Sequence, residues 1–168
     1  AQELTHPSRI IETSLGNLFA DIFAENAACD VALIGSGSIR QKQMGPVVTL
    51  RDLRQTFPYD DVYRRFTVTG EQVQRIFSHI MRAENRNSEG ECYHVNRGVR
   101  VVHDDHPNKQ LSLEIMGKPI DPPAHYPIGL LDYHYSNVFQ NLGISNKEIT
   151  ALSAPKVTTT SMMNVAEE

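Results

Sequence analysis

The stretch of sequence that decides the fold is Asp30–Arg40, which reads DVALIGSGSIR. It begins as a short apolar run with β-branched residues and ends in a cluster of Gly and Ser, which predicts a buried strand followed by a tight loop. Gly35 and Gly37 remove side-chain bulk from this loop, and its successive backbone N–H groups can form an anion nest beside Arg40. The Lys-Ser/Thr pair of a phosphate-binding P-loop is missing. From the residues alone, a ligand site and an ordinary strand-to-loop turn both fit this pattern.

The composition predicts a single folded domain. The chain has 168 residues, of which 40% are apolar and 21% charged, and a chain of this length can bury a sizeable core. Its formal charge of −4, without a dense run of Lys or Arg, does not favour a nucleic acid polymer or an anionic membrane as partner. No apolar run reaches the roughly 18 residues of a membrane segment. Cys29 and Cys92 show no close metal or redox spacing, so they leave the compartment and their own pairing open.

Helix and strand signals surround the central stretch. Ser14 is expected to cap a helix with one apolar face, made of Leu15, Leu18, Phe19, Ile22 and Phe23. Beyond the loop, Val47–Leu50 is a second predicted strand. Thr49 then caps a short helix through Leu53, which must end before Pro58. The chain starts without Met and without a signal-peptide pattern, so we expect a processed or excised piece of a longer protein.

The second half of the chain contains the clearest helix. Thr69 and Gln72 form a capping box, and an apolar face follows them at helical spacing. The other predicted elements are strands at Arg65–Thr69, Tyr93–His103, Leu111–Met116 and Tyr126–Leu131 and a short helix at Asn137–Leu142. A turn at Pro107-Asn108 joins the middle pair into a hairpin. This order predicts an α+β fold with mixed β-sheets and packed helices, in one compact domain over residues 1–152, followed by a polar tail over residues 153–168 that is open to disorder.

Four blocks of sequence follow one another at a characteristic spacing. They are Ser14–Asp21, Asp30–Arg40, Thr49–Leu53 with Phe57–Asp61, and Val68–Gly70. In this order they resemble the C-terminal, substrate-binding domain of the 5′-nucleotidase and 2′,3′-cyclic phosphodiesterase family. The resemblance continues through Val101–Asp104 and covers roughly residues 9 to 145.

The resemblance implies a two-domain hydrolase. In such a protein an N-terminal metallophosphoesterase domain holds two divalent metal ions and hydrolyses a phosphoester, while the C-terminal domain binds the nucleoside part of a nucleotide. The sequence contains no Gly-Asn-His-Asp/Glu or Gly-His-x-His element of the metal domain, so we expect this chain alone to be inactive and to hold no cofactor. The bacterial members of the family imply an extracellular, periplasmic or wall-attached location.

The resemblance also implies a substrate site, made of Arg9, Gly35, Gly37, Arg40, Tyr59, Asp61 and Tyr133. In this site the two arginines are candidates for phosphate or ribose contact, and the two tyrosines stack on a flat base. Two departures leave the substrate open. Gly35 stands where many members have a substrate-binding Asn, and Ser136–Phe139 stands where they have Gly-Gly-Asp-Gly. These departures motivate an alternative, a non-enzymatic ligand-binding or interaction module that retains the fold.

One further cluster contains possible metal ligands. The residues at 103–106 read His-Asp-Asp-His and carry nitrogen and oxygen donors. They coincide with the predicted hairpin turn, so we interpret them as turn residues. His134 is interpreted as a structural histidine, with assistance to a ligand at Tyr133 as the alternative.

Overall fold

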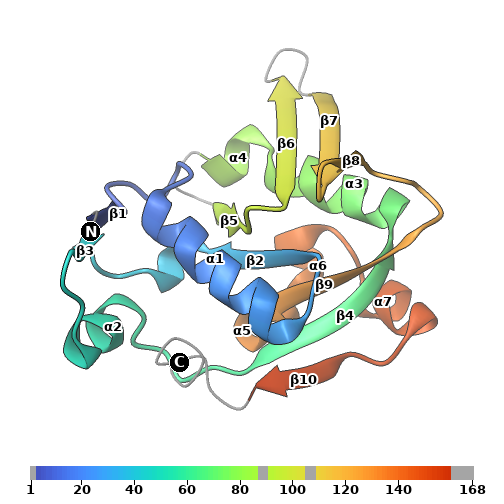
Figure 1. The fold of residues 1–168 in the computed structure, drawn as a ribbon. Coiled ribbons are helices and arrows are strands. Elements are labelled where there is room, and N and C mark those ends of the chain that lie inside the picture. Colours follow the sequence, from blue (N-terminus) through green and yellow to red (C-terminus); the bar gives the residue numbers. More distant parts are fainter. Residues whose placement is uncertain (1–2, 87–90, 105–108, 160–168) are drawn as a thin grey trace.

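A mixed five-stranded sheet forms the centre of the computed structural model, which describes residues 3–86, 91–104 and 109–159 (Figure 1). The strand order is β10 (Lys156–Thr159), β4 (Tyr63–Thr69), β9 (His125–Leu131), β2 (Val31–Gly35) and β5 (Tyr93–Val95). β2 runs parallel to β9, and the other neighbours are antiparallel. The predicted strand of the central stretch is confirmed, and it lies in the interior of this sheet.

Two smaller sheets complete the strand content. One consists of β6 (Val99–Asp104), β7 (Lys109–Ile115) and β8 (Lys118–Pro119), and the other of β1 (Leu4–Thr5) and β3 (Gln43–Met44). β6 and β7 are antiparallel, so the predicted hairpin is confirmed, whereas its turn lies outside the described residues. The chain therefore has the α+β fold that the sequence predicts.

Some helices cover the two faces of the central sheet, and others lie beside it. They are α1 (Ser14–Ala27), α2 (Leu50–Thr56), α3 (Gly70–Ile80), α4 (Ala83–Arg86), α5 (Asp132–Ser136), α6 (Val138–Leu142) and α7 (Asn146–Leu152), with a short 3-10 helix at Ser36–Ser38. α1 lies along β2 and β5 (Figure 1). Among the described residues, no helix is long and apolar enough to cross a membrane.

β2 separates two hydrophobic cores. Because successive side chains of a strand point to opposite faces, Val31 and Leu33 pack with α3, α6 and α7, whereas Ala32 and Ile34 pack with α1. All five residues of β2 are buried. A strand that is covered on both faces reads as a continuous apolar run, which is the pattern that the sequence shows.

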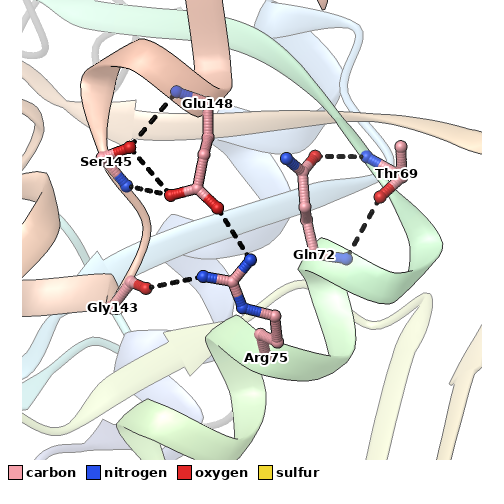
Figure 2. A network of polar contacts seen from close by, with 6 residues as sticks. All are labelled: Thr69, Gln72, Arg75, Gly143, Ser145 and Glu148. Atoms are coloured by element: carbon pink, nitrogen blue, oxygen red, sulfur yellow. Dashed lines mark hydrogen bonds and ion pairs between the residues drawn. The ribbon is translucent and has the colours of Figure 1, made fainter.

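Arg75 connects α3 to α7, and each of these two helices begins with a capping box (Figure 2). Thr69 and Gln72 cap α3, as predicted, and Ser145 and Glu148 cap α7 in the same way. Arg75 of α3 donates to the Glu148 carboxylate at 2.7 Å and to the Gly143 carbonyl at 3.4 Å. The pKa of Glu148 falls to about 2, because the Ser145 N–H and then Arg75 favour the charged carboxylate. The predicted short helix at Asn137–Leu142 is confirmed as α6, but the sequence interpretation missed α7.

Two predictions in the first third of the chain are wrong. Thr13 caps α1 in place of Ser14, and its side chain accepts from the Gly16 N–H at 3.2 Å. Val47–Leu50 is not a strand, since Val47 is 81% exposed and Leu50 begins α2. Pro46 has no N–H to offer to a ladder, and the Thr49 N–H is engaged by Asp52 in a capping box. The Thr49 cap itself is confirmed.

Two predictions in the second half also need correction. The single strand predicted at Tyr93–His103 is two strands, β5 and β6, which belong to different sheets. Asn96 separates them, because its amide accepts from the Ala32 N–H at 2.9 Å and donates to the Asp30 carbonyl at 3.1 Å. The prediction of a polar tail from residue 153 is wrong for Lys156–Thr159, because these residues form β10 and pair with β4. Residues 160–168 lie outside the described part.

We predict that Glu148→Gln lowers the free energy of unfolding by up to about 1 kcal/mol, the contribution of a partly exposed ion pair, because Gln can still form the capping box. The amide removes the charge that Arg75 and the Ser145 N–H both stabilise. Urea denaturation at pH 7 measures the change. Glu71→Gln is the matched control, because exposed Glu71 occupies the first turn of α3. Equal losses in the two variants would contradict the role of the connection to Arg75.

Candidate functional site

One edge of the central sheet collects the predicted site residues. β2 and β9 are parallel, so both end at this edge. β5 and β4 are antiparallel to them and begin there, as the pairs Gly35 with Tyr93 and Leu131 with Tyr63 show. The glycine loop after β2, the segment before β4, the segment before β5 and helix α5 after β9 therefore meet.

A cavity of about 830 Å³ opens at this edge. Its volume lies within the range of small-molecule sites. Of the residues predicted to bind substrate, the cavity is lined by Arg9, Gly37, Arg40, Tyr59, Asp61 and Tyr133. The sequence interpretation missed other lining residues, namely Ser38, Asp60, Glu91, Leu131, Asp132 and Ser136. His134, which it treated as structural, also lines the cavity.

The glycine loop is not an open anion nest. The Gly37 N–H donates to the Glu91 carboxylate at 2.8 Å, so an acidic side chain of the protein itself occupies the loop. The Ser36 N–H donates to the Cys92 carbonyl at 2.7 Å, and the Arg40 N–H donates to the Thr56 carbonyl at 2.7 Å. The N–H groups of Ser36, Gly37 and Arg40 already have partners within the chain, which favours the strand-to-loop turn over the anion nest that the sequence left open.

Gly35 does not line the cavity but makes room for residues that do. A Cβ atom at this position would lie 2.6 Å from the His134 ring and 2.7 Å from the Glu91 carboxylate. Gly37 leaves more space, since a Cβ atom there would lie 3.4 Å from Glu91. The missing side chain at position 35 is thus a packing requirement of the cavity wall.

The aromatic part of the wall carries two exposed tyrosines. Tyr59 is 39% exposed, and Arg40 donates to its hydroxyl while the guanidinium lies 5.2 Å from the centre of its ring. Tyr133 is 69% exposed on α5. A cation close to a ring helps to hold that ring in place. Tyr59 and Tyr133 are thus two exposed aromatic side chains on the cavity wall.

Asp61 positions the two segments that carry these tyrosines. Its carboxylate accepts from the Tyr133 N–H at 3.0 Å and from the Val62 N–H at 2.9 Å. A carboxylate at the first turn of a helix also stabilises the exposed N–H groups there. Asp61 thus ties the segment before β4 to the start of α5.

His134 forms the buried floor behind Tyr133. It is 5% exposed, its Nδ1 lies 2.9 Å from the Tyr93 hydroxyl, and its ring makes edge contacts with Tyr93 and Tyr133 at centroid distances of 5.4 Å. Burial lowers its pKa to about 4. At neutral pH the cavity therefore has a neutral imidazole on its floor.

A second buried histidine lies beneath the start of α1. His94 accepts from the Thr13 N–H at 3.4 Å, and burial lowers its pKa to about 4. His6 contacts it edge to face and approaches Ser36 of the glycine loop at 3.4 Å. Burial lowers the pKa of His6 as well. This cluster contacts the loop at Ser36, which does not line the cavity.

The described residues show no sign of a redox or metal centre at the site. Cys29 forms no disulfide, and burial raises its pKa to about 12. In the parts of the chain that the structure describes, no group of three or more His, Cys, Asp or Glu side chains could hold a metal ion. Half of the cluster predicted at 103–106 lies outside those parts.

A comparison with known protein families identifies the family of the chain. A family model of the 5′-nucleotidase C-terminal domain matches residues 2–141. The chain belongs to this family. The resemblance drawn from the four sequence blocks is thereby confirmed. No curated protein sequence matches the chain.

Solved structures show the same fold. NAD nucleotidase of Haemophilus influenzae matches 99% of the chain with a TM-score of 0.78 at 14% identity, and the match covers 33% of that protein. A 5′-nucleotidase precursor of Thermus thermophilus matches 97% with a TM-score of 0.68 at 16% identity, over 34% of its length. A sulfate thiohydrolase of Thermus thermophilus matches 97% with a TM-score of 0.66 at 17% identity, over 30% of its length. The chain spans about a third of the length of these relatives.

We predict that Gly35→Ala lowers the free energy of unfolding by roughly 1 to 3 kcal/mol, because the new methyl group collides with His134 and Glu91. Gly37→Ala is the matched control from the same loop and should cost less. Urea denaturation of both variants makes the comparison. If Gly37→Ala is the more damaging variant, the packing role of Gly35 is refuted.

We also predict that stability falls as the pH decreases from 7 to 5.5. The folded pKa of His94 and of His134 is about 4, below the ordinary 6.5, so the unfolded chain binds more protons in this range. The contribution of each histidine to the free energy of unfolding is fully present above pH 6.5. By pH 5.5 this contribution should fall by about 1 kcal/mol for each histidine. Urea denaturation across this range measures the slope.

Substituting one buried histidine tests the assignment. His94→Gln should give a shallower slope, whereas His125→Gln, at an exposed position, should leave the slope as it is. A slope that is the same in wild type and His94→Gln would disprove the contribution of His94.

Proposed function

We propose that this chain is the substrate-binding, specificity-setting domain of a two-domain, metal-dependent hydrolase of the 5′-nucleotidase kind. In this proposal the cavity at the sheet edge binds the nucleoside part of a nucleotide. The observation that carries it is the convergence of Tyr59 and Tyr133, both exposed, on one cavity that also contains Arg9 and Arg40. Stacking on an aromatic side chain contributes about 1 to 3 kcal/mol per base.

Each group of the wall has a separate task in this proposal. The rings of Tyr59 and Tyr133 hold the flat base. Asp61 joins the segments that carry these two tyrosines through its hydrogen bond from the Tyr133 N–H. Arg9 and Arg40 bring positive charge for the phosphate or ribose end of the ligand. The buried residues around His134 exclude water from the floor of the cavity. The chain therefore binds and orients, and the bond-breaking step belongs elsewhere.

The hydrolytic step is assigned to a separate N-terminal metallophosphoesterase domain. The described residues gather no metal-binding group, so they do not fit the two divalent ions that the resemblance implies. Those ions would activate a water molecule and polarise the phosphoester when bound in that other domain. We also propose an extracellular, periplasmic or wall-attached location for the whole protein, because its resemblance is to exported bacterial nucleotidases.

Nucleotides are the favoured substrate class among the alternatives that the fold offers. The structural relatives include an NAD nucleotidase and a 5′-nucleotidase precursor, but also a sulfate thiohydrolase, so the fold by itself does not select the substrate. Two exposed tyrosines on the cavity wall favour a ligand with a flat ring. Their geometry therefore supports a nucleotide over a non-aromatic ester.

A non-enzymatic ligand-binding module is the second candidate. It is favoured by the Gly37 N–H, which donates to Glu91 and is therefore not available to a phosphate. The gene sequence upstream of residue 1 separates the two candidates. A metallophosphoesterase domain there supports the hydrolase, and its absence supports the binding module.

We predict that the chain binds adenosine and AMP and that Tyr133→Ala weakens this binding by roughly 5- to 100-fold, the loss expected for one stacked base. Calorimetric titration of the 168-residue chain measures it. Phe139→Ala is a matched control, because Phe139 is also 69% exposed but does not line the cavity. The proposed function fails if neither ligand binds, or if Phe139→Ala weakens binding as much as Tyr133→Ala.

A further inference from the structure

Glu91 places a carboxylate on the cavity wall at the glycine loop, where the sequence leaves an anion nest open. It precedes β5 and reaches across to the glycine loop, where the Gly37 N–H donates to its Oε1 at 2.8 Å. Glu91 also lines the cavity. At this point the cavity wall presents the acceptor oxygens of Glu91 to a ligand. Without Glu91, the loop would present the Gly37 N–H donor.

The surroundings of Glu91 keep this carboxylate in place. A Cβ atom at Gly35 would lie 2.7 Å from its Oε1, and a Cβ atom at Gly37 would lie 3.4 Å and 3.5 Å from its two oxygens. Burial raises the pKa of Glu91, while the Gly37 N–H, Arg9 and Arg40 oppose that rise. The loop and the two arginines thus hold a half-buried carboxylate that does not lie at an ordinary surface position.

A carboxylate with one anchored oxygen still has acceptor capacity. An ionised carboxylate offers about four lone-pair positions, and the Gly37 N–H uses one of them. A ligand hydroxyl or amino group can donate to the others, whereas a phosphate would meet a like charge. The chemistry of this part of the wall therefore fits a neutral donor group.

We propose that Glu91 is a specificity-determining residue, which selects ligands that present a hydrogen-bond donor to the glycine loop and keeps the phosphate away from it. This inference rests on the proposed nucleoside site. Two parts of a nucleoside supply such a donor, the sugar hydroxyls and an exocyclic amino group. The phosphate then contacts the side chain of Arg9 or Arg40 and not the Gly37 N–H, which Glu91 already occupies.

Glu91→Gln is the variant that tests this inference. The amide keeps an oxygen for the Gly37 N–H and replaces the other oxygen with a donor, so the loop stays anchored while the acceptor is lost. We expect adenosine to bind roughly 10- to 100-fold more weakly to this variant, the loss of one hydrogen bond to a charged group. Glu71→Gln is the matched control, since Glu71 is an exposed glutamate on α3 that does not line the cavity. It should change the affinity by less than about 3-fold.

Adenosine analogues identify the donor that Glu91 selects. The analogues are 2′-deoxyadenosine, 3′-deoxyadenosine and purine riboside, which lack one hydroxyl, the other hydroxyl and the amino group. The wild-type chain should bind one of them roughly 10- to 100-fold more weakly than adenosine. For that analogue, Glu91→Gln should cause no further loss, because the interaction is already absent.

The outcomes separate this inference from the proposed function. If the wild-type chain binds no nucleoside, the proposed function is overturned and the inference with it. If the wild type binds adenosine and Glu91→Gln binds it equally well, only the inference is overturned. A loss of the same size for adenosine and all three analogues also overturns it, because it shows a structural effect and no selection.

Discussion

The parallel pairing of β2 with β9 determines which segments of the chain meet at the cavity edge of the central sheet. Val31 pairs with Ile128 and Leu33 with Leu130, which sets both strand ends at one edge of the sheet. The antiparallel neighbours then begin at the same edge. Four segments that are distant in the sequence meet there, and their side chains enclose the cavity. Because both faces of β2 are buried, the strand cannot slip by one residue without exchanging its two cores.

The cavity wall is organised before any ligand arrives. Glu91 anchors the glycine loop, Asp61 joins the two tyrosine-bearing segments, and the Tyr93 hydroxyl contacts the His134 ring. A wall that is already held in place loses little conformational freedom when a ligand binds. The same contacts also remove the loop donors from the set that a phosphate could use. The glycine loop is therefore better arranged for an uncharged donor group than for a phosphate.

Local sequence signals predicted the elements that local chemistry determines. The capping residues Thr49 and Thr69 predicted the starts of α2 and α3, and the apolar run predicted β2. The sequence interpretation missed α5, because its first turn depends on Asp61, which is 72 positions from Tyr133. It assigned β10 to a tail, because a short polar edge strand derives its order from pairing with β4 and not from a pattern of its own.

The site was predicted in part for the same reason. Resemblance to the family identified six of the residues that line the cavity, but it could not identify Glu91, whose partner Gly37 lies 54 positions away. It also assigned Gly35 to the ligand, although the structure shows that Gly35 makes room for two other side chains. No local pattern around Glu91 distinguishes it from an ordinary acidic residue before a strand.

A crystal structure of the chain with adenosine bound is the most direct test of this account. It should show the base against the rings of Tyr59 and Tyr133, with a hydroxyl or amino group of the ligand donating to the Glu91 carboxylate. An adenosine molecule bound away from the sheet-edge cavity, or one whose base contacts neither tyrosine, would contradict the account.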